Sequence, residues 1–194
     1  MKRRVLSLLV VALFTAAAWA QGAEWQIDPA HTTVAFTVRH MGISNVHGRF
    51  TKVSGSAVVN DNDPSKDSVN ATIDATSIDT GVEMRDNDLK SANYFDVAQF
   101  GTITFKSKSV SKNGDGKLKI VGDLTIHGVT KEVTLDVDGP SAPAKMGPNL
   151  KRGLSATTTV NRKDFGVGMK YPAAVVGEQI KIDIDTELGQ KAAQ

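Results

Sequence analysis

Residues 117–138 read KLKIVGDLTIHGVTKEVTLDVD, and this stretch decides the fold class. Apolar and polar residues alternate along both of its halves. The apolar positions are Leu118, Ile120, Leu124 and Ile126 in the first half and Val129, Val133, Leu135 and Val137 in the second. Such alternation is typical of strands with one face in the core and one in water. His127-Gly128 separates the halves, and because glycine accepts positive φ, it predicts a tight turn between antiparallel strands.

The same alternation recurs on both sides of this stretch. The predicted strand runs are 25–27, 32–40, 48–59, 69–75, 102–110, 117–126, 129–138, 153–161 and 178–188. Such a set predicts an all-β sandwich or closed barrel, and the long alternating runs favour an antiparallel barrel of about eight strands. A barrel of that size either fills its interior with side chains or holds one small ligand there. The alternation alone leaves this choice open.

One short helix is predicted over 80–91, across one end of the sheet. Thr80 followed by Glu83 three residues later forms a capping-box pattern. We expect Met84 and Leu89 to be its inward contacts, although its polar composition also suits a solvated connecting helix. Between the strands, turn residues predict a hairpin turn at 113–116 and a longer proline-containing loop at 140–149.

The first 20 residues have the layout of a secretory signal peptide. A positive n-region at 2–4 precedes an apolar run, and 18–20 read Ala-Trp-Ala, a small-x-small cleavage site. The apolar run is shorter than the roughly 20 residues of a comfortable membrane span. We therefore expect cleavage after Ala20, one mature domain over 21–194 without a stable membrane anchor, and a periplasmic location. The alternative is an uncleaved N-terminal anchor.

Charge and cysteine content exclude several function classes. Removing the three basic residues of the leader leaves 20 of the 23 basic residues against 21 acidic ones. Such a balance, with scattered charges, has no electrostatic footprint for nucleic acid. The chain has no cysteine, which excludes thiol catalysis, zinc–thiolate sites and iron–sulfur clusters. No cofactor is predicted. The sequence does not decide whether the chain forms a homodimer.

The histidines are the remaining candidates for site chemistry. They are His31, His40, His47 and His127, and none forms an H-x-x-x-H or H-E-x-x-H pattern, so no metal site is predicted. His127 lies in the predicted hairpin turn, and we expect its role to be structural. The other three could fall on neighbouring strands, and an exported hydrolase or metal-dependent enzyme that uses His31, His40 or His47 is the alternative to a binding protein. Without a nucleophile elbow or phosphate loop, no catalytic residue is predicted.

Several stretches together resemble the YceI family of periplasmic proteins. The stretch 28–42 is similar to that family's opening D-x-x-H-S/T-x-x-x-F-x-x-x-H pattern, with His31, Phe36 and His40 at the matching positions. The other similar stretches are 48–50 with Gly55, 77–80, 85–86, 89–91, 94–96, Phe105, 122–133 and 162–166. Together they span essentially all of 24–187. The loop at 140–149 and Leu154 depart from the family's pattern and bear on ligand choice.

The resemblance implies a lipocalin-like barrel with an elongated internal cavity. It also implies a binder or carrier of a long hydrophobic amphiphile, such as a polyisoprenoid, an isoprenoid quinone or a fatty-acid-like lipid. Arg85 is the expected headgroup contact, with His40 and Arg49 as secondary candidates. The predicted ligand-binding residues are Val34, Phe36, Val38, His40, Phe50, Met84, Arg85, Leu89, Phe95, Phe105, Leu124, Leu135, Phe165 and Met169. A fully filled interior would instead favour a structural or stress-protective module.

Overall fold

The hairpin predicted over 117–138 is present in the computed structural model, which describes residues 22–191 and thus leaves the expected leader outside. β7 (Lys117–Ile126) and β8 (Val129–Asp138) pair antiparallel over their whole length. Between them His127 and Gly128 have φ values of 51° and 74°. A two-residue turn of this kind needs positive φ at both positions, and the prediction from His127-Gly128 is confirmed.

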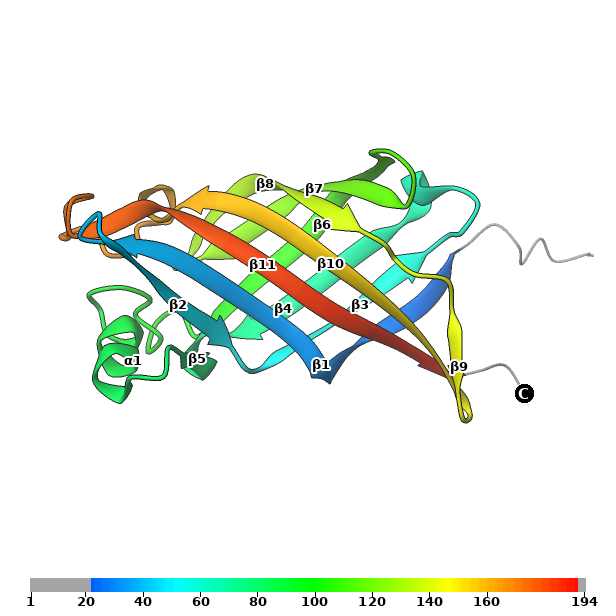
Figure 1. The fold of residues 1–194 in the computed structure, drawn as a ribbon, viewed down its shortest axis with the longest axis horizontal. Helices are drawn as coiled ribbons and strands as arrows, with labels where there is room; N and C mark the ends of the chain where they lie inside the picture. The colour runs from blue at the N-terminus through cyan, green and yellow to red at the C-terminus, as the bar shows by residue number, and fades with distance from the viewer. Residues whose placement is uncertain (1–21, 192–194) are drawn as a thin grey trace, which may run out of the picture.

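Eight antiparallel strands close into a barrel (Figure 1). Around the ring they are β1 (Ala23–His40), β3 (Val53–Val59), β4 (Ser68–Asp74), β6 (Thr102–Lys112), β7, β8, β10 (Asn149–Asn161) and β11 (Val176–Lys191). The ring closes because β1 also pairs with β11, from Gln26↔Gly189 to His40↔Val176. The predicted all-β barrel of about eight strands is therefore confirmed.

Two strand boundaries differ from the prediction. The runs 25–27 and 32–40 belong to one strand, β1, which bulges between Ile27 and Thr32. Pro29 lies in that bulge, and proline cannot donate to a strand ladder. Conversely, the run 48–59 splits into β2 (Ser44–Phe50) and β3, because the chain bends between them and the two strands pair with different stretches of β1.

The helix is shorter than predicted, and its expected cap is wrong. α1 spans Glu83–Lys90, with Val82 at the N-cap position and no side-chain cap. Thr80 lies outside the helix, where its hydroxyl donates to the Asp86 carboxylate at 2.5 Å and accepts from Arg85 Nε at 2.8 Å. The expected inward contact of Met84 is also wrong, since this residue is 82% exposed. Its place in the first turn of a polar helix turns it to solvent.

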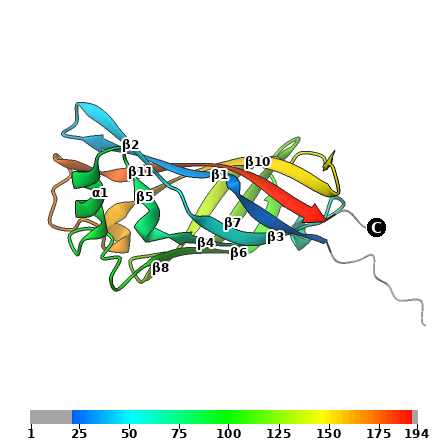
Figure 2. The same cartoon turned by 90° about the horizontal axis from the view of Figure 1, so that it is seen from below.

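The remaining elements distinguish the two ends of the barrel (Figures 1 and 2). One end carries α1, β2, β5 (Ile78–Asp79), η2 (Ala75–Ser77) and η3 (Arg162–Phe165), and we call it the α1 end. The opposite end carries β9 (Ala144–Met146), η1 (Pro64–Lys66), the first residues of β1 and the last residues of β11, and we call it the β9 end.

The buried apolar residues form three clusters inside the barrel. The largest lies toward the α1 end and includes Phe50, Ile103 and Phe165. A second surrounds Ile120 on the β6–β8 side, and a third at the β9 end is built on Trp25. Half-buried side chains that contact these clusters face a common internal space, which is the candidate site.

Candidate ligand-binding cavity

An elongated cavity lies between these clusters. It has a volume of about 230 Å³, counted as the space that the centres of water molecules could occupy, and it is partly open to solvent. One water needs only about 10–15 Å³ on that measure. The wall follows β11 from Val176 to Leu188, twelve residues apart, or roughly 40 Å along a strand. Such a shape fits a chain better than a compact molecule.

The cavity wall is almost wholly apolar. Aliphatic and aromatic side chains from every barrel strand contribute to it, together with Leu89 of α1. The polar residues among its lining are Thr32, Tyr94, Thr158, Arg162 and Thr186. A wall of this composition favours an apolar occupant, because apolar contacts there cost no unsatisfied hydrogen bond.

Ten of the fourteen predicted ligand-binding residues line this cavity. They are Val34, Phe36, Val38, Phe50, Leu89, Phe95, Phe105, Leu124, Leu135 and Phe165. Strand alternation placed most of them correctly, since side chains two apart share a face. Contact with a ligand itself stays a prediction for each.

The other four predicted residues are not part of the lining. Met84 and Met169 are 82% and 58% exposed, on α1 and in the loop after η3. His40 is exposed at the last position of β1. Arg85 is held by Thr80, whose hydroxyl and carbonyl accept its Nε and Nη2 protons at 2.8 and 2.9 Å. These four side chains therefore do not line the cavity, because they lie at a strand end, in a loop or on the polar helix. Whether they contact a ligand stays a prediction.

The phenylalanine rings of the wall fit against glycines. Phe36 lies opposite Gly48 in the β1–β2 pair, where an added Cβ would be 2.3 Å from the Phe36 ring. A Cβ on Gly122 would likewise be 2.6 Å from the ring of Phe105. Because each ring lies over a position without a side chain, it can lean along the wall instead of crossing the cavity.

Arg162 at the α1 end is a lining residue that the sequence analysis did not assign. It is 4% exposed, and its guanidinium donates five hydrogen bonds to the carbonyls of Val167, Gly168, Tyr171, Val176 and Gly177, at 2.6–3.0 Å. Every N–H of the side chain is therefore used. The residue fastens the loop after η3 to the start of β11 and thereby holds this part of the wall together. The quoted 162–166 stretch contained it, but no pattern indicated this role.

Tyr94 completes the polar part of that wall. Its ring stacks on Tyr171 with the centroids 4.9 Å apart. Burial, followed by the neighbouring Tyr171, raises the pKa of Tyr94 to about 12. Tyr94 therefore stays a neutral phenol at ordinary pH and is a poor general base.

The β9 end is plugged by a buried aromatic–cation pair. Trp25 is 2% exposed, and the Arg152 guanidinium lies 5.0 Å from its ring centroid. Arg152 in turn donates two hydrogen bonds of 2.7 Å to the Asp61 carboxylate. The buried guanidinium of Arg152 thus has an anionic partner, as a buried charge requires, while the Asp61 side chain itself is exposed. This plug lies beyond Ala57 and Leu188, which form the last part of the cavity wall.

The histidines considered for a metal site are not brought together. His40 pairs with Val176, whereas His31 lies beside Glu187, about ten residues or roughly 33 Å further along the strand. His47 contacts Thr37, with Nδ1 3.0 Å from the hydroxyl. A metal needs ligand atoms about 2 Å from one centre, so this trio cannot share an ion.

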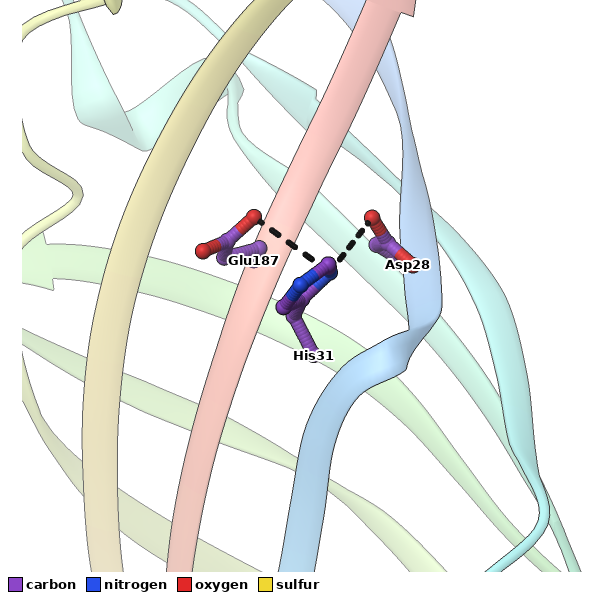
Figure 3. A group of neighbouring side chains, drawn as sticks. All are labelled: Asp28, His31 and Glu187. Carbon is purple, nitrogen blue, oxygen red and sulfur yellow. Dashed lines mark hydrogen bonds and ion pairs between the residues drawn. The ribbon is translucent and has the colours of Figure 1, made fainter.

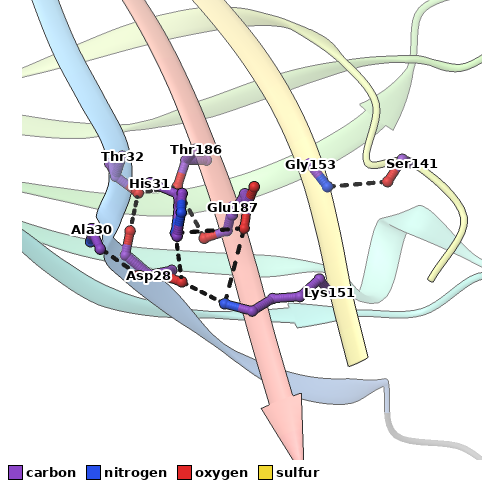
Figure 4. Close-up of polar contacts among 9 residues, drawn as sticks. All are labelled: Asp28, Ala30, His31, Thr32, Ser141, Lys151, Gly153, Thr186 and Glu187. Carbon is purple, nitrogen blue, oxygen red and sulfur yellow. Dashed lines mark hydrogen bonds and ion pairs between the residues drawn. The ribbon is translucent and has the colours of Figure 1, made fainter. Parts of the chain in front are cut away.

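A separate polar cluster surrounds His31 on the outside of the barrel (Figure 3). His31 Nδ1 lies 3.1 Å from Asp28 Oδ2 and 3.8 Å from Glu187 Oε2, and one ligand atom of each of the three residues lies within 4.8 Å of the others, close enough to surround a cation. Lys151 already reaches into the cluster from β10, bonded to Asp28 and 3.9 Å from Glu187 (Figure 4). These contacts, the one from Lys151 first, hold the pKa of Asp28 well below its usual range.

The role of this cluster in the fold is to hold the β1 bulge. Asp28 also accepts the amide proton of Ala30 at 3.0 Å, and its carbonyl accepts the Thr32 hydroxyl at 2.7 Å. The bulge is thus tied to itself and, across the intervening β11, to β10 (Figure 4). The ammonium of Lys151 supplies the positive charge that the carboxylates need, so the geometry is that of an ion-pair network.

The fold and the cavity together define a lipocalin-like barrel, a small closed antiparallel sheet around an apolar interior. The chain belongs to the YceI family, since the model of the YceI-like domain matches residues 25–188. It is 36% identical over 189 residues to "Protein YceI" of Escherichia coli O157:H7, covering 96% of this chain and 97% of that one.

Solved structures agree with this assignment. The YCEI protein of Campylobacter jejuni is 28% identical with a TM-score of 0.72, covering 79% of this chain and 90% of that one. A structure described as a polyisoprenoid binding domain, from Saccharophagus degradans, has the same fold with a TM-score of 0.62 at 15% identity, covering 87% and 98%. Within residues 22–191, none of the helices has the length and apolar character needed to cross a membrane.

Proposed function

We propose that the mature chain is a periplasmic protein that binds the apolar chain of a polyisoprenoid, an isoprenoid quinone or a similar lipid in the barrel, and that it catalyses no reaction. The single observation that carries this proposal is the continuous apolar wall that follows β11 from Val176 to Leu188. A chain transferred from water to such a wall gains about 0.8 kcal/mol per buried CH₂.

The polar residues of the wall support binding over catalysis. All five N–H groups of the Arg162 side chain donate to backbone carbonyls. Tyr94 keeps its proton because its pKa is about 12. The threonines Thr32 and Thr186 bond to each other at 2.6 Å. Among the described lining residues, therefore, none pairs a nucleophile with a base.

The size of the cavity sets a condition on this function. About 230 Å³ is somewhat below the roughly 300–1,000 Å³ of ordinary ligand sites. A long chain therefore requires half-buried side chains of the wall to change position as the chain enters. The neighbour from Saccharophagus degradans, described as binding polyisoprenoid, supports the same ligand class.

The test is to export the full chain, purify it without detergent, extract it with organic solvent and identify the extract by mass spectrometry. We expect the extract to contain a lipid with a long apolar chain. After delipidation, the protein should take up an added long-chain isoprenyl alcohol in near-stoichiometric amount. A protein that carries no lipid and takes up none of the added alcohol would overturn the proposal. N-terminal sequencing of the same sample tests the location, with Gln21 expected as the first residue.

A further inference from the structure

The exposed apolar side chains are concentrated at one end of the molecule. Of the seven large hydrophobic residues that are exposed among those described, six lie at the α1 end. They are Met41 (57%), Ile43 (77%), Val82 (43%), Met84 (82%), Met169 (58%) and Val175 (38%). Single exposed apolar residues are ordinary, but such clustering marks an interaction surface.

Two adjacent segments carry four of these residues. Met41 and Ile43 form the turn between β1 and β2, and Met169 and Val175 lie in the loop between η3 and β11. The segments touch, since the Met41 amide donates to the Val175 carbonyl at 2.9 Å. A hairpin turn is normally built of polar residues, so a turn that exposes Met41 and Ile43 has no explanation in the fold alone.

The charges of these two segments have one sign. The stretch 38–48 contains Arg39 and two histidines, the stretch 166–177 contains Lys170, and neither stretch contains an aspartate or glutamate. Both cations are exposed, and each donates to uncharged groups: Arg39 to the Gly42 carbonyl and the Asn45 side chain, Lys170 to the Asn93 side chain. We call the surface formed by Met41, Ile43, Met169, Val175, Arg39 and Lys170 the basic apolar rim.

The rim is continuous with the wall of the cavity. Val38 and Val176 line the cavity, and they are the next inward-facing residues along the chain from Met41 and Val175. Tyr171 in the rim loop stacks on Tyr94, another lining residue. The opposite end contains the buried pair of Trp25 and Arg152. The apolar surface therefore adjoins the part of the cavity wall at the α1 end.

We propose that the basic apolar rim docks reversibly on a lipid bilayer that contains anionic phospholipid, and that the apolar chain of the ligand passes between bilayer and cavity at this end. This inference rests on the proposed function, because a chain insoluble in water must be exchanged with a lipid phase. Methionine and isoleucine at an exposed turn suit shallow insertion at the boundary of headgroups and acyl chains. Arg39 and Lys170, whose side-chain hydrogen bonds within the described residues all go to uncharged groups, complement the negative headgroups.

Vesicle flotation tests docking directly. The full mature protein is mixed with vesicles of phosphatidylcholine alone or of phosphatidylcholine with phosphatidylglycerol, and we expect it to float with the anionic vesicles at low salt. Ile43→Glu should lower the bound fraction about tenfold or more, and Lys170→Gln should weaken it more on anionic than on neutral vesicles. Met146→Glu, at a 63% exposed methionine of the β9 end, is the matched control and should bind like the wild type.

Two further measurements separate this inference from the function on which it rests. Equilibrium binding of a long-chain isoprenyl alcohol delivered from cyclodextrin should be unchanged in Ile43→Glu, whereas its transfer from anionic vesicles should slow in step with docking. Intact equilibrium binding without vesicle flotation overturns the docking surface and leaves the proposed function standing. If the wild type does not float with vesicles but forms dimers in sedimentation velocity, and Ile43→Glu dissociates these dimers, the rim is a contact between copies and the proposal is overturned. If the wild type does not bind the isoprenyl alcohol at equilibrium, the proposed function itself is overturned.

Discussion

The substitution Phe105→Trp tests whether the interior of the barrel is a ligand cavity or a packed core. The ring of Phe105 lines the cavity, and its outer side is blocked by Gly122, where even a methyl group would lie 2.6 Å from the ring. The larger indole must therefore extend into the cavity. We expect it to displace about two or three methylenes of a bound chain, each worth about 0.8 kcal/mol. The cost of about 1.6–2.4 kcal/mol corresponds to a 15- to 60-fold rise in Kd.

The assay is titration of the delipidated protein with a long-chain isoprenyl alcohol, alongside thermal unfolding. Phe100→Trp is the matched control, because Phe100 packs on His127 with centroids 4.5 Å apart and is not part of the cavity lining. Its affinity should equal that of the wild type. If Phe105 instead belongs to a filled core, overpacking costs about 1–3 kcal/mol of stability, or roughly 2–12 °C in Tm. An unchanged Kd together with such a fall in Tm would refute the cavity.

Four shorter predictions follow from other parts of the structure. Gly48→Ala places a Cβ 2.3 Å from the Phe36 ring, so the ring must tilt inward; binding should weaken in the same titration while the Tm changes little. Asp28→Asn removes a carboxylate whose pKa is lowered chiefly by Lys151; its stabilising effect exists above the ordinary pKa of about 4 and is lost as the pH falls through the folded value, so the Tm gap between wild type and variant should be widest near neutral pH and close in strong acid. Arg162→Lys replaces five donors by three and should cost about 2–6 kcal/mol in urea unfolding; a smaller loss would show that the carbonyls find other partners. Removal of divalent metal with a chelator should leave the Tm unchanged, because the Lys151 ammonium already compensates the carboxylates around Asp28, and a fall would contradict this.

Most of the fold could be predicted from period-two alternation. The pattern carries over directly from sequence to structure in β7, where one residue in two is buried, and the turn residues between β7 and β8 match the turn. The exceptions were local. Alternation cannot show that Pro29 interrupts a ladder without ending the strand. The capping-box pattern cannot show that Thr80 bonds to the side chains of Arg85 and Asp86 instead of capping the helix backbone. Such details depend on partners distant in sequence.

The candidate site was predictable where it is made of strands and unpredictable at its ends. Phe36, Phe105 and Leu135 face inward because their strands do. Met84 and Met169 lie where no repeating pattern determines direction, and there hydrophobicity alone suggested the wrong side. Arg162 was missed for a physical reason, since a buried guanidinium bonded to five carbonyls leaves no trace in the local pattern.

Closure of the barrel by its first and last strands has a kinetic consequence. The hydroxyls of Thr32 and Thr186 meet at 2.6 Å across a sequence separation of 154 residues. The entropy of closing so long a loop opposes the contact until most other strands are in place, and folding dominated by such distant pairings is slow. During synthesis the seam cannot form before the C-terminal strand exists. A chain truncated before β11 would expose two unpaired edges, on β1 and β10, and the whole apolar interior, so a short C-terminal deletion should produce aggregation instead of a slightly smaller barrel.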